Sequence, residues 1–232
     1  RGALLFEKPG VLGPASKFNT KLEVKQENPD AYRRFSVEAA AGVSYELTDT
    51  QTVSAGVNVE YARLTDSFNV DLETITVSLP LEYVRDTRDN RLNPTTGTRL
   101  SLLVEPAHEI NGAATFVKFR AEATAYRALD ADKRFVAAGR LAAGSIYGAA
   151  LSAIPANRRF YAGGGGSVRG YGYQGIGPVD ATGTPTGGRS LVEASAELRI
   201  GVTETIGIVP FLDAGLVSAS ESFSGAEFKA GA

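Results

Sequence analysis

Arg169 stands in a loop whose composition suits close packing better than solvation. Around it, residues 158–171 read RRFYAGGGGSVRGY, with four consecutive glycines and three aromatic side chains. Glycine lets a backbone approach another surface closely, whereas solvated loops favour residues such as Asp, Asn and Ser. An arginine withdrawn from water needs a carboxylate partner, because an unpaired buried charge is strongly destabilising. The loop therefore predicts a carboxylate site for Arg169 elsewhere in the chain.

Glu197 and Asp213 are the carboxylates whose spacing suits this arginine. Each lies eight residues from Thr205, one before it and one after it. A hairpin turn centred near Thr205 places them close to opposite one another, on the polar faces of two neighbouring strands. Two carboxylates that close repel one another, and a guanidinium between them removes the conflict. We expect Arg169 to bridge the pair.

Other chemistries lack the residues that they need. Cysteine is absent and His108 is the single histidine, which excludes thiolate nucleophiles, disulfides and the usual zinc and iron sites. Residues 86–90 could hold calcium, but the EF-hand spacing is not met and turn capping is the simpler explanation of their polar side chains. Residues 170–175 match G-x-G-x-x-G without a following helix, and 163–166 lack the lysine of a phosphate loop. With a net charge of -2 there is no basic stripe for nucleic acid. We predict a protein without enzymatic activity, metal or cofactor.

Long strands with one apolar and one polar face must position these groups. From residue 35 to 47 the odd positions are mostly apolar and the even positions mostly small or polar, and four further segments repeat this two-residue period. No amphipathic helix is predicted. The predicted strands cover residues 2–8, 17–27, 34–47, 52–64, 72–84, 98–108, 115–129, 135–147, 191–202 and 206–217, and an eleventh begins near Phe228.

Alternating apolar and polar residues fit both a membrane barrel and a soluble sandwich, and the length of the strands favours the membrane barrel. Globular strands average roughly 5 or 6 residues, whereas about 12 residues tilted by roughly 45° span close to 30 Å of hydrocarbon. A transmembrane helix over residues 135–154 would bury Arg140 at a cost of about 2.5 to 3.5 kcal/mol. The predicted fold class is an all-β, antiparallel transmembrane β-barrel, of which these residues form ten to eleven strands.

The connections indicate which end of the strands faces outward. Tight turns at 48–51, 130–134 and 203–205 fall on one side, and the longest connection, residues 149–190, falls on the other. Outer-membrane barrels alternate short periplasmic turns with longer outer loops in this way. The turn at 85–97 is an exception, being long on the short side. We expect residues 149–190 to fold inward into the barrel.

The loop sequence also resembles a family motif. Val168-Arg169-Gly170-Tyr171, preceded by RFYAGG at 159–164, resembles the Val-Arg-Gly-Phe/Tyr loop of the BamA and TamA superfamily, the bacterial surface antigen family. Residues 86–97, 187–198 and 210–215 resemble further motifs of that family in the same order. The resemblance implies that Arg169 lies inside the barrel against Glu197 and Asp213. The residues that it marks as supporting this contact are Phe160, Gly163, Gly164 and Phe211.

The TamA branch is the most similar, and its members have sixteen strands preceded by periplasmic POTRA domains. The resemblance implies that residues 1–232 are one partial barrel domain, with the POTRA domains and the first and last strands outside them. It further implies a bacterial outer-membrane protein that inserts nascent outer-membrane or autotransporter proteins without covalent chemistry, through the seam between those two strands. The implied partners are the lipid bilayer, these substrates and a TamB-like partner spanning the periplasm. A two-partner secretion pore, a BamA-type insertase and a general porin are the alternatives.

Overall fold

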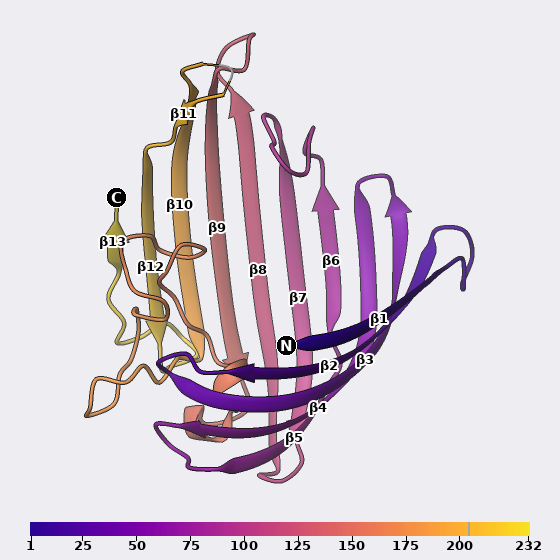
Figure 1. The fold of residues 1–232 in the computed structure, drawn as a ribbon, viewed down its shortest axis with the longest axis vertical. Helices are drawn as coiled ribbons and strands as arrows, with labels where there is room; N and C mark the ends of the chain where they lie inside the picture. The colour runs from indigo at the N-terminus through magenta and orange to yellow at the C-terminus, as the bar shows by residue number, and fades with distance from the viewer. Residues whose placement is uncertain (204) are drawn as a thin grey trace.

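A computed structural model describes residues 1–203 and 205–232 as one curved antiparallel sheet (Figure 1). Thirteen strands form it, and β1 and β13 lie at its two ends. In Figure 1, β7 to β10 run close to vertical and β1 to β5 run across that direction. The sheet is therefore strongly curved, as the wall of a barrel is. The strands are β1 (Gly2–Pro9), β2 (Ser16–Glu27), β3 (Tyr32–Thr48), β4 (Gln51–Asp66), β5 (Leu72–Ser78), β6 (Leu81–Asp86), β7 (Gly97–Glu109), β8 (Ala114–Ala128), β9 (Phe135–Tyr147), β10 (Ser190–Gly201), β11 (Gly207–Ile208), β12 (Phe211–Ser218) and β13 (Lys229–Gly231).

The register follows the two-residue alternation. Val37 of β3 pairs with Tyr61 of β4, and Ala39 pairs with Val59, so the apolar positions of neighbouring strands share one face. Side chains on this face stay exposed, as at Val57 (48%) and Val59 (42%). A continuous exposed apolar surface of this kind is typical of a wall in contact with lipid. The predicted antiparallel barrel sheet is confirmed.

Two strands predicted as continuous are interrupted, each at a proline. The segment 72–84 divides into β5 and β6 around Pro80, which cannot donate a ladder hydrogen bond. The N–H of Leu79 instead donates to the carbonyl of Pro106, and Gly56 donates to the carbonyl of Pro80. The segment 206–217 divides into β11 and β12 around Pro210 in the same way. With β6 and β11 counted as parts of interrupted strands, the remaining eleven follow one another along the sheet, as predicted.

The connection between β9 and β10, residues 148–189 and hereafter the long loop, packs against the inner face of the sheet. It contains two short 3-10 turns, η1 (Leu151–Ala153) and η2 (Ala156–Arg158). Residues 135–147 form β9, and among the described residues no helix is long and apolar enough to cross a membrane. The main apolar core lies between the long loop and β7 to β12. Its buried members are Ala107, Phe116, Ile146, Ile154, Phe160, Ala162, Val168, Ile176, Leu191 and Val217.

Candidate functional site: the inward loop and its anchors

The glycines around Arg169 give the long loop a path that other residues would strain. Gly163, Gly164 and Gly170 have φ angles of 105°, 96° and 89°, in the region that favours glycine. A Cβ atom on Gly163 would also lie 2.5 Å from the carbonyl oxygen of Gly172. The backbone therefore folds tightly back on itself around Val168 and Arg169, with Gly163 against Gly172.

Arg169 is held by five hydrogen bonds to the strands that follow the loop. Its Nε donates to Asp213 Oδ2 at 2.6 Å and its Nη2 to Asp213 Oδ1 at 2.8 Å, a bidentate contact. Its Nη1 donates to Glu197 Oε1 at 2.8 Å, and its Nη2 also reaches Ser195 Oγ at 3.1 Å. The backbone N–H of Arg169 adds a bond of 3.0 Å to Asp213 Oδ2. The structure thus brings together the three charged residues singled out in the sequence.

The register at this contact differs from the predicted one by two residues. Asp213 pairs with Ser195, and Glu197 pairs with Phe211. The turn closes between Val202 and Ile206, so its midpoint precedes Thr205 by one residue. The two carboxylates are diagonal neighbours on the inner face, and the guanidinium spans that diagonal.

Packing and charge further stabilise the contacts of Arg169 with Asp213 and Glu197, hereafter the clamp. The Arg169 guanidinium lies 3.7 Å from the ring centroid of Phe211, within cation–π range. Ser195 Oγ donates to Asp213 Oδ1 at 2.6 Å, so the carboxylate, whose side chain is fully buried, keeps several donors. Hydrogen bonding to Asp213 and then to Glu197 raises the pKa of Arg169 above its already high value. Arg169 therefore stays charged, and the contact is a permanent ion pair with no proton to transfer.

The other residues of the motif seat the loop on the wall. Val168 is fully buried, and its Cγ2 occupies the space where a Cβ on Gly215 would lie. Tyr171 donates from its hydroxyl to the carbonyl of Ala230 at 3.2 Å. Phe160 is 3% exposed and lies over Gly144 of β9, where a Cβ would come within 2.4 Å of its ring. Each of these contacts requires a small residue or a backbone group on the sheet.

Arg159 forms a second anchor that the sequence reading did not identify. Its Nη2 donates to Asp66 Oδ2 at 2.6 Å, and both side chains are 1% exposed. Its Nε and Nη1 donate to the carbonyls of Ile154 and Thr186 within the long loop. Asp66 Oδ1 meanwhile accepts from the N–H of Asn69, which closes the turn between β4 and β5. The loop is thus tied to β4 as well as to β10 and β12.

No sequence signal pointed to Asp66, because 93 residues separate it from Arg159. Further polar contacts between loop and wall have the same long-range character. The Nδ2 of Asn157 donates to Glu60 Oε1 at 2.8 Å, and Arg158 Nη1 donates to Glu105 Oε1 at 2.9 Å. Ser167 Oγ donates to Glu193, which also pairs with Arg140 at 2.9 Å. Each of these carboxylates lies on an inner strand face and meets a donor from the loop or a neighbouring strand.

The carboxylates of the long turn between β6 and β7 already have partners within the turn. Asp86 accepts from Nε and Nη2 of Arg88 at 2.8 and 2.7 Å. Asp89 accepts from the backbone of Thr95 and Thr96 at 2.9 and 3.1 Å. Hydrogen bonds from Thr95 come first among the causes that hold the pKa of Asp89 below its usual value. This is the geometry of a capped turn.

Comparisons with known proteins agree with this architecture. The Omp85 superfamily domain matches residues 1–231. The outer membrane protein assembly factor BamA of Nitratidesulfovibrio vulgaris is 31% identical over 148 residues, which cover 62% of this chain and 18% of that protein. BamA from Haemophilus ducreyi lacking POTRA domains 1-3 superposes with a TM-score of 0.76 at 16% identity, over 93% of this chain and 49% of that one. CdiB from Acinetobacter baumannii superposes with a TM-score of 0.62 at 15% identity, over 98% and 42% of the respective chains. The chain therefore spans less than half the length of each of these relatives.

Proposed function

From the premise that the chain belongs to the Omp85 superfamily of outer-membrane β-barrel proteins, we propose that it serves to insert other β-barrel proteins into the outer membrane. The observation that carries the proposal is the clamp of Arg169 on Asp213 and Glu197, which fixes a long loop inside the wall. The relative from Nitratidesulfovibrio vulgaris, named as an outer membrane protein assembly factor, supports the same reading. The finer proposal is a TamA-like factor for autotransporters, working with a TamB-like periplasmic partner.

The proposed action is mechanical and involves no covalent chemistry. The ion pairs of Arg169 and Arg159 hold the two sides of the long loop against β12 and β4, which are far apart in the sheet. A wall braced in this way keeps its curvature while strands at its edges exchange partners with a substrate strand. The fixed charges contribute by holding the loop in place.

The packing of the long loop argues against a general porin. A diffusion channel keeps a polar, water-filled interior. Here an apolar cluster that includes Ile154, Phe160 and Ile176 fills the space between loop and wall. This supports a role in which the loop is a structural element.

The proposal is tested with the protein expressed from its own gene, purified and reconstituted into vesicles of bacterial phospholipid. An unfolded outer-membrane barrel protein is added, and its folding is followed by its heat-modifiable mobility on gels. We expect folding to accelerate with the wild-type protein and to lose most of this acceleration with Arg169→Ala. The matched control is Arg85→Ala, since Arg85 lies on the outward face at the opposite end of the strands.

A second arm of the experiment distinguishes insertion from secretion. An unfolded soluble exoprotein is offered outside the same vesicles, and protease protection measures its transport into the lumen. Transport of the exoprotein without faster barrel folding would overturn the proposal in favour of a two-partner secretion pore. Faster folding of a barrel but not of an autotransporter would overturn only the TamA-like refinement and would favour a BamA-type insertase.

A further inference from the structure

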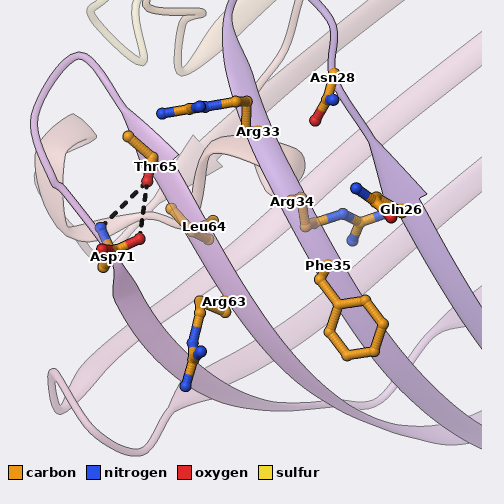
Figure 2. A pocket seen from close by; sticks show the side chains of 9 residues that line it. All are labelled: Gln26, Asn28, Arg33, Arg34, Phe35, Arg63, Leu64, Thr65 and Asp71. Carbon is orange, nitrogen blue, oxygen red and sulfur yellow. Dashed lines mark hydrogen bonds between the residues drawn. The ribbon is translucent and has the colours of Figure 1, made fainter.

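The outward face of the sheet carries a hollow at the end where the long loop lies, and most of the residues that line it are polar or charged. Its volume is about 320 Å³, and Figure 2 shows the lining side chains, which come from β2, β3, β4 and the turns that follow β2 and precede β5. Gln26 pairs with Phe35 and Phe35 pairs with Arg63, so these three share the apolar, outward face. Arg33 pairs with Thr65 one row nearer the long-loop end. The hollow is therefore on the surface that faces lipid.

The depth of the hollow in the membrane follows from the apolar band below it. Outward positions of β3 are apolar from Phe35 to Leu47. Twelve steps of about 3.3 Å at a tilt of roughly 45° cover about 28 Å, which is close to the hydrocarbon thickness. Arg33 is the next outward residue, at the long-loop end. Because long loops of outer-membrane barrels are extracellular, Arg33 lies at the headgroup level of the outer leaflet.

Arg33 lies at this level, and Arg63 pairs with Phe35 one row nearer the hydrocarbon, from where a long arginine side chain extends to the headgroups. Arg33 is exposed and makes no ion pair or side-chain hydrogen bond with any residue that the structure describes. Arg63 is exposed and pairs with Glu73 through Nη2, so Nε and Nη1 are the donors that it can turn toward an anion. As diagonal neighbours across β3 and β4, the two arginines have Cα atoms about 7 Å apart. Figure 2 shows their guanidinium groups pointing apart, so both exposed side chains must turn to meet one anion, and planar guanidinium donors match phosphate.

We propose that this hollow binds the phosphorylated headgroup of an outer-leaflet glycolipid. Arg33 and Arg63 hold the phosphate, and the amides of Gln26, on the same face, and of Asn28, in the turn that follows β2, donate to the sugar oxygens beside it. Phe35 lies one step nearer the hydrocarbon and contacts the first carbons of the acyl chains. The glycolipid thereby fastens the β2–β4 region of the wall to the outer leaflet. The proposal rests on the membrane placement and does not depend on the insertion activity.

The test measures lipid retention by the full protein in detergent, using native mass spectrometry. The probes are bis-phosphorylated lipid A, the same lipid A without phosphates, phosphatidylglycerol and inorganic phosphate. We expect the wild-type protein to retain bis-phosphorylated lipid A at least about tenfold better than the dephosphorylated form, as two charge-assisted contacts provide. The variant R33Q/R63Q should lose this preference, and R33K/R63K should keep part of it.

The matched control is R85Q/R127Q, which removes two outward arginines at the opposite rim of the same face. It should retain lipid A as the wild-type protein does. Equal retention of the phosphorylated and dephosphorylated lipids by wild-type protein would overturn the proposal, and this comparison needs no variant to fold. Equal retention of phosphatidylglycerol, or displacement of lipid A by an equal concentration of inorganic phosphate, would also overturn it.

Discussion

The buried pair of Arg159 and Asp66 allows the anchoring of the long loop to be measured as a free energy. Asp66→Asn keeps one side-chain oxygen for the N–H groups of the β4–β5 turn, yet it removes the charge that faces Arg159. Because both side chains are 1% exposed, the guanidinium is left buried without a counter-ion. Loss of one partner of a buried pair costs about 3 to 5 kcal/mol. We expect a loss of free energy of unfolding near the lower end of that range.

The double variant makes this prediction sharper. Arg159→Met alone leaves the Asp66 carboxylate buried and the carbonyls of Ile154 and Thr186 without their donor, at about 1 to 3 kcal/mol for each unsatisfied group. Asp66→Asn combined with Arg159→Met removes both charges together. Its loss should be smaller than the sum of the single losses by at least about 2 kcal/mol, since contacting residues are not additive.

The assay is urea unfolding of the protein in phospholipid vesicles, followed by tyrosine fluorescence. Protease cleavage within the long loop gives an independent measure of its release. The control is Glu7→Gln, which breaks the exposed pair with Lys17 (side chains 61% and 51% exposed) and should cost less than about 1 kcal/mol. An Asp66→Asn variant as stable as Glu7→Gln, or strictly additive losses in the double variant, would show that the buried pair does not anchor the long loop.

Three further predictions concern the long loop. Arg169→Lys should lower the heat resistance of the folded protein on gels almost as much as Arg169→Ala, because a lysine cannot make the bidentate contact; full resistance in the lysine variant would contradict this. Hydrogen bonds from Thr182 lower the pKa of Asp180 to about 2 from its usual 3.8, so this contribution to loop stability is complete above about pH 4 and is lost as the pH falls toward 2. Carboxyl chemical shifts measured by NMR should titrate accordingly, and a midpoint near 4 would disprove the assignment. Gly144→Val should displace the ring of Phe160 and destabilise the protein by about 1 to 3 kcal/mol in urea unfolding. Gly139→Val on the same strand should cost much less, because a Cβ at Gly139 meets the carbonyl oxygen of Ser195 at 3.8 Å, an ordinary contact distance.

The strands could be predicted because the alternation of apolar and polar residues within each strand identifies its two faces. The alternation at residues 35–47 reappears as β3, with its apolar side chains outward. Interruptions at Pro80 and Pro210 also had a local cause, although the alternation ran across both prolines and concealed them. The register predicted for the hairpin around Thr205 was wrong by two residues, because an alternating pattern of apolar and polar residues is unchanged by a shift of two.

The sheet, its lipid-facing side and the three charged groups at residues 169, 197 and 213 could be predicted from the sequence alone, since period, turn length and motif are local properties. Which inner strand each side chain of the long loop contacts depends on the three-dimensional fold. Arg159 meets Asp66, and Phe160 meets Gly144, because a curved wall brings β4 and β9 to the same loop. A buried guanidinium accepts any carboxylate that closure of the fold brings within reach. Its partner is therefore set by curvature and register, which no short stretch of sequence encodes.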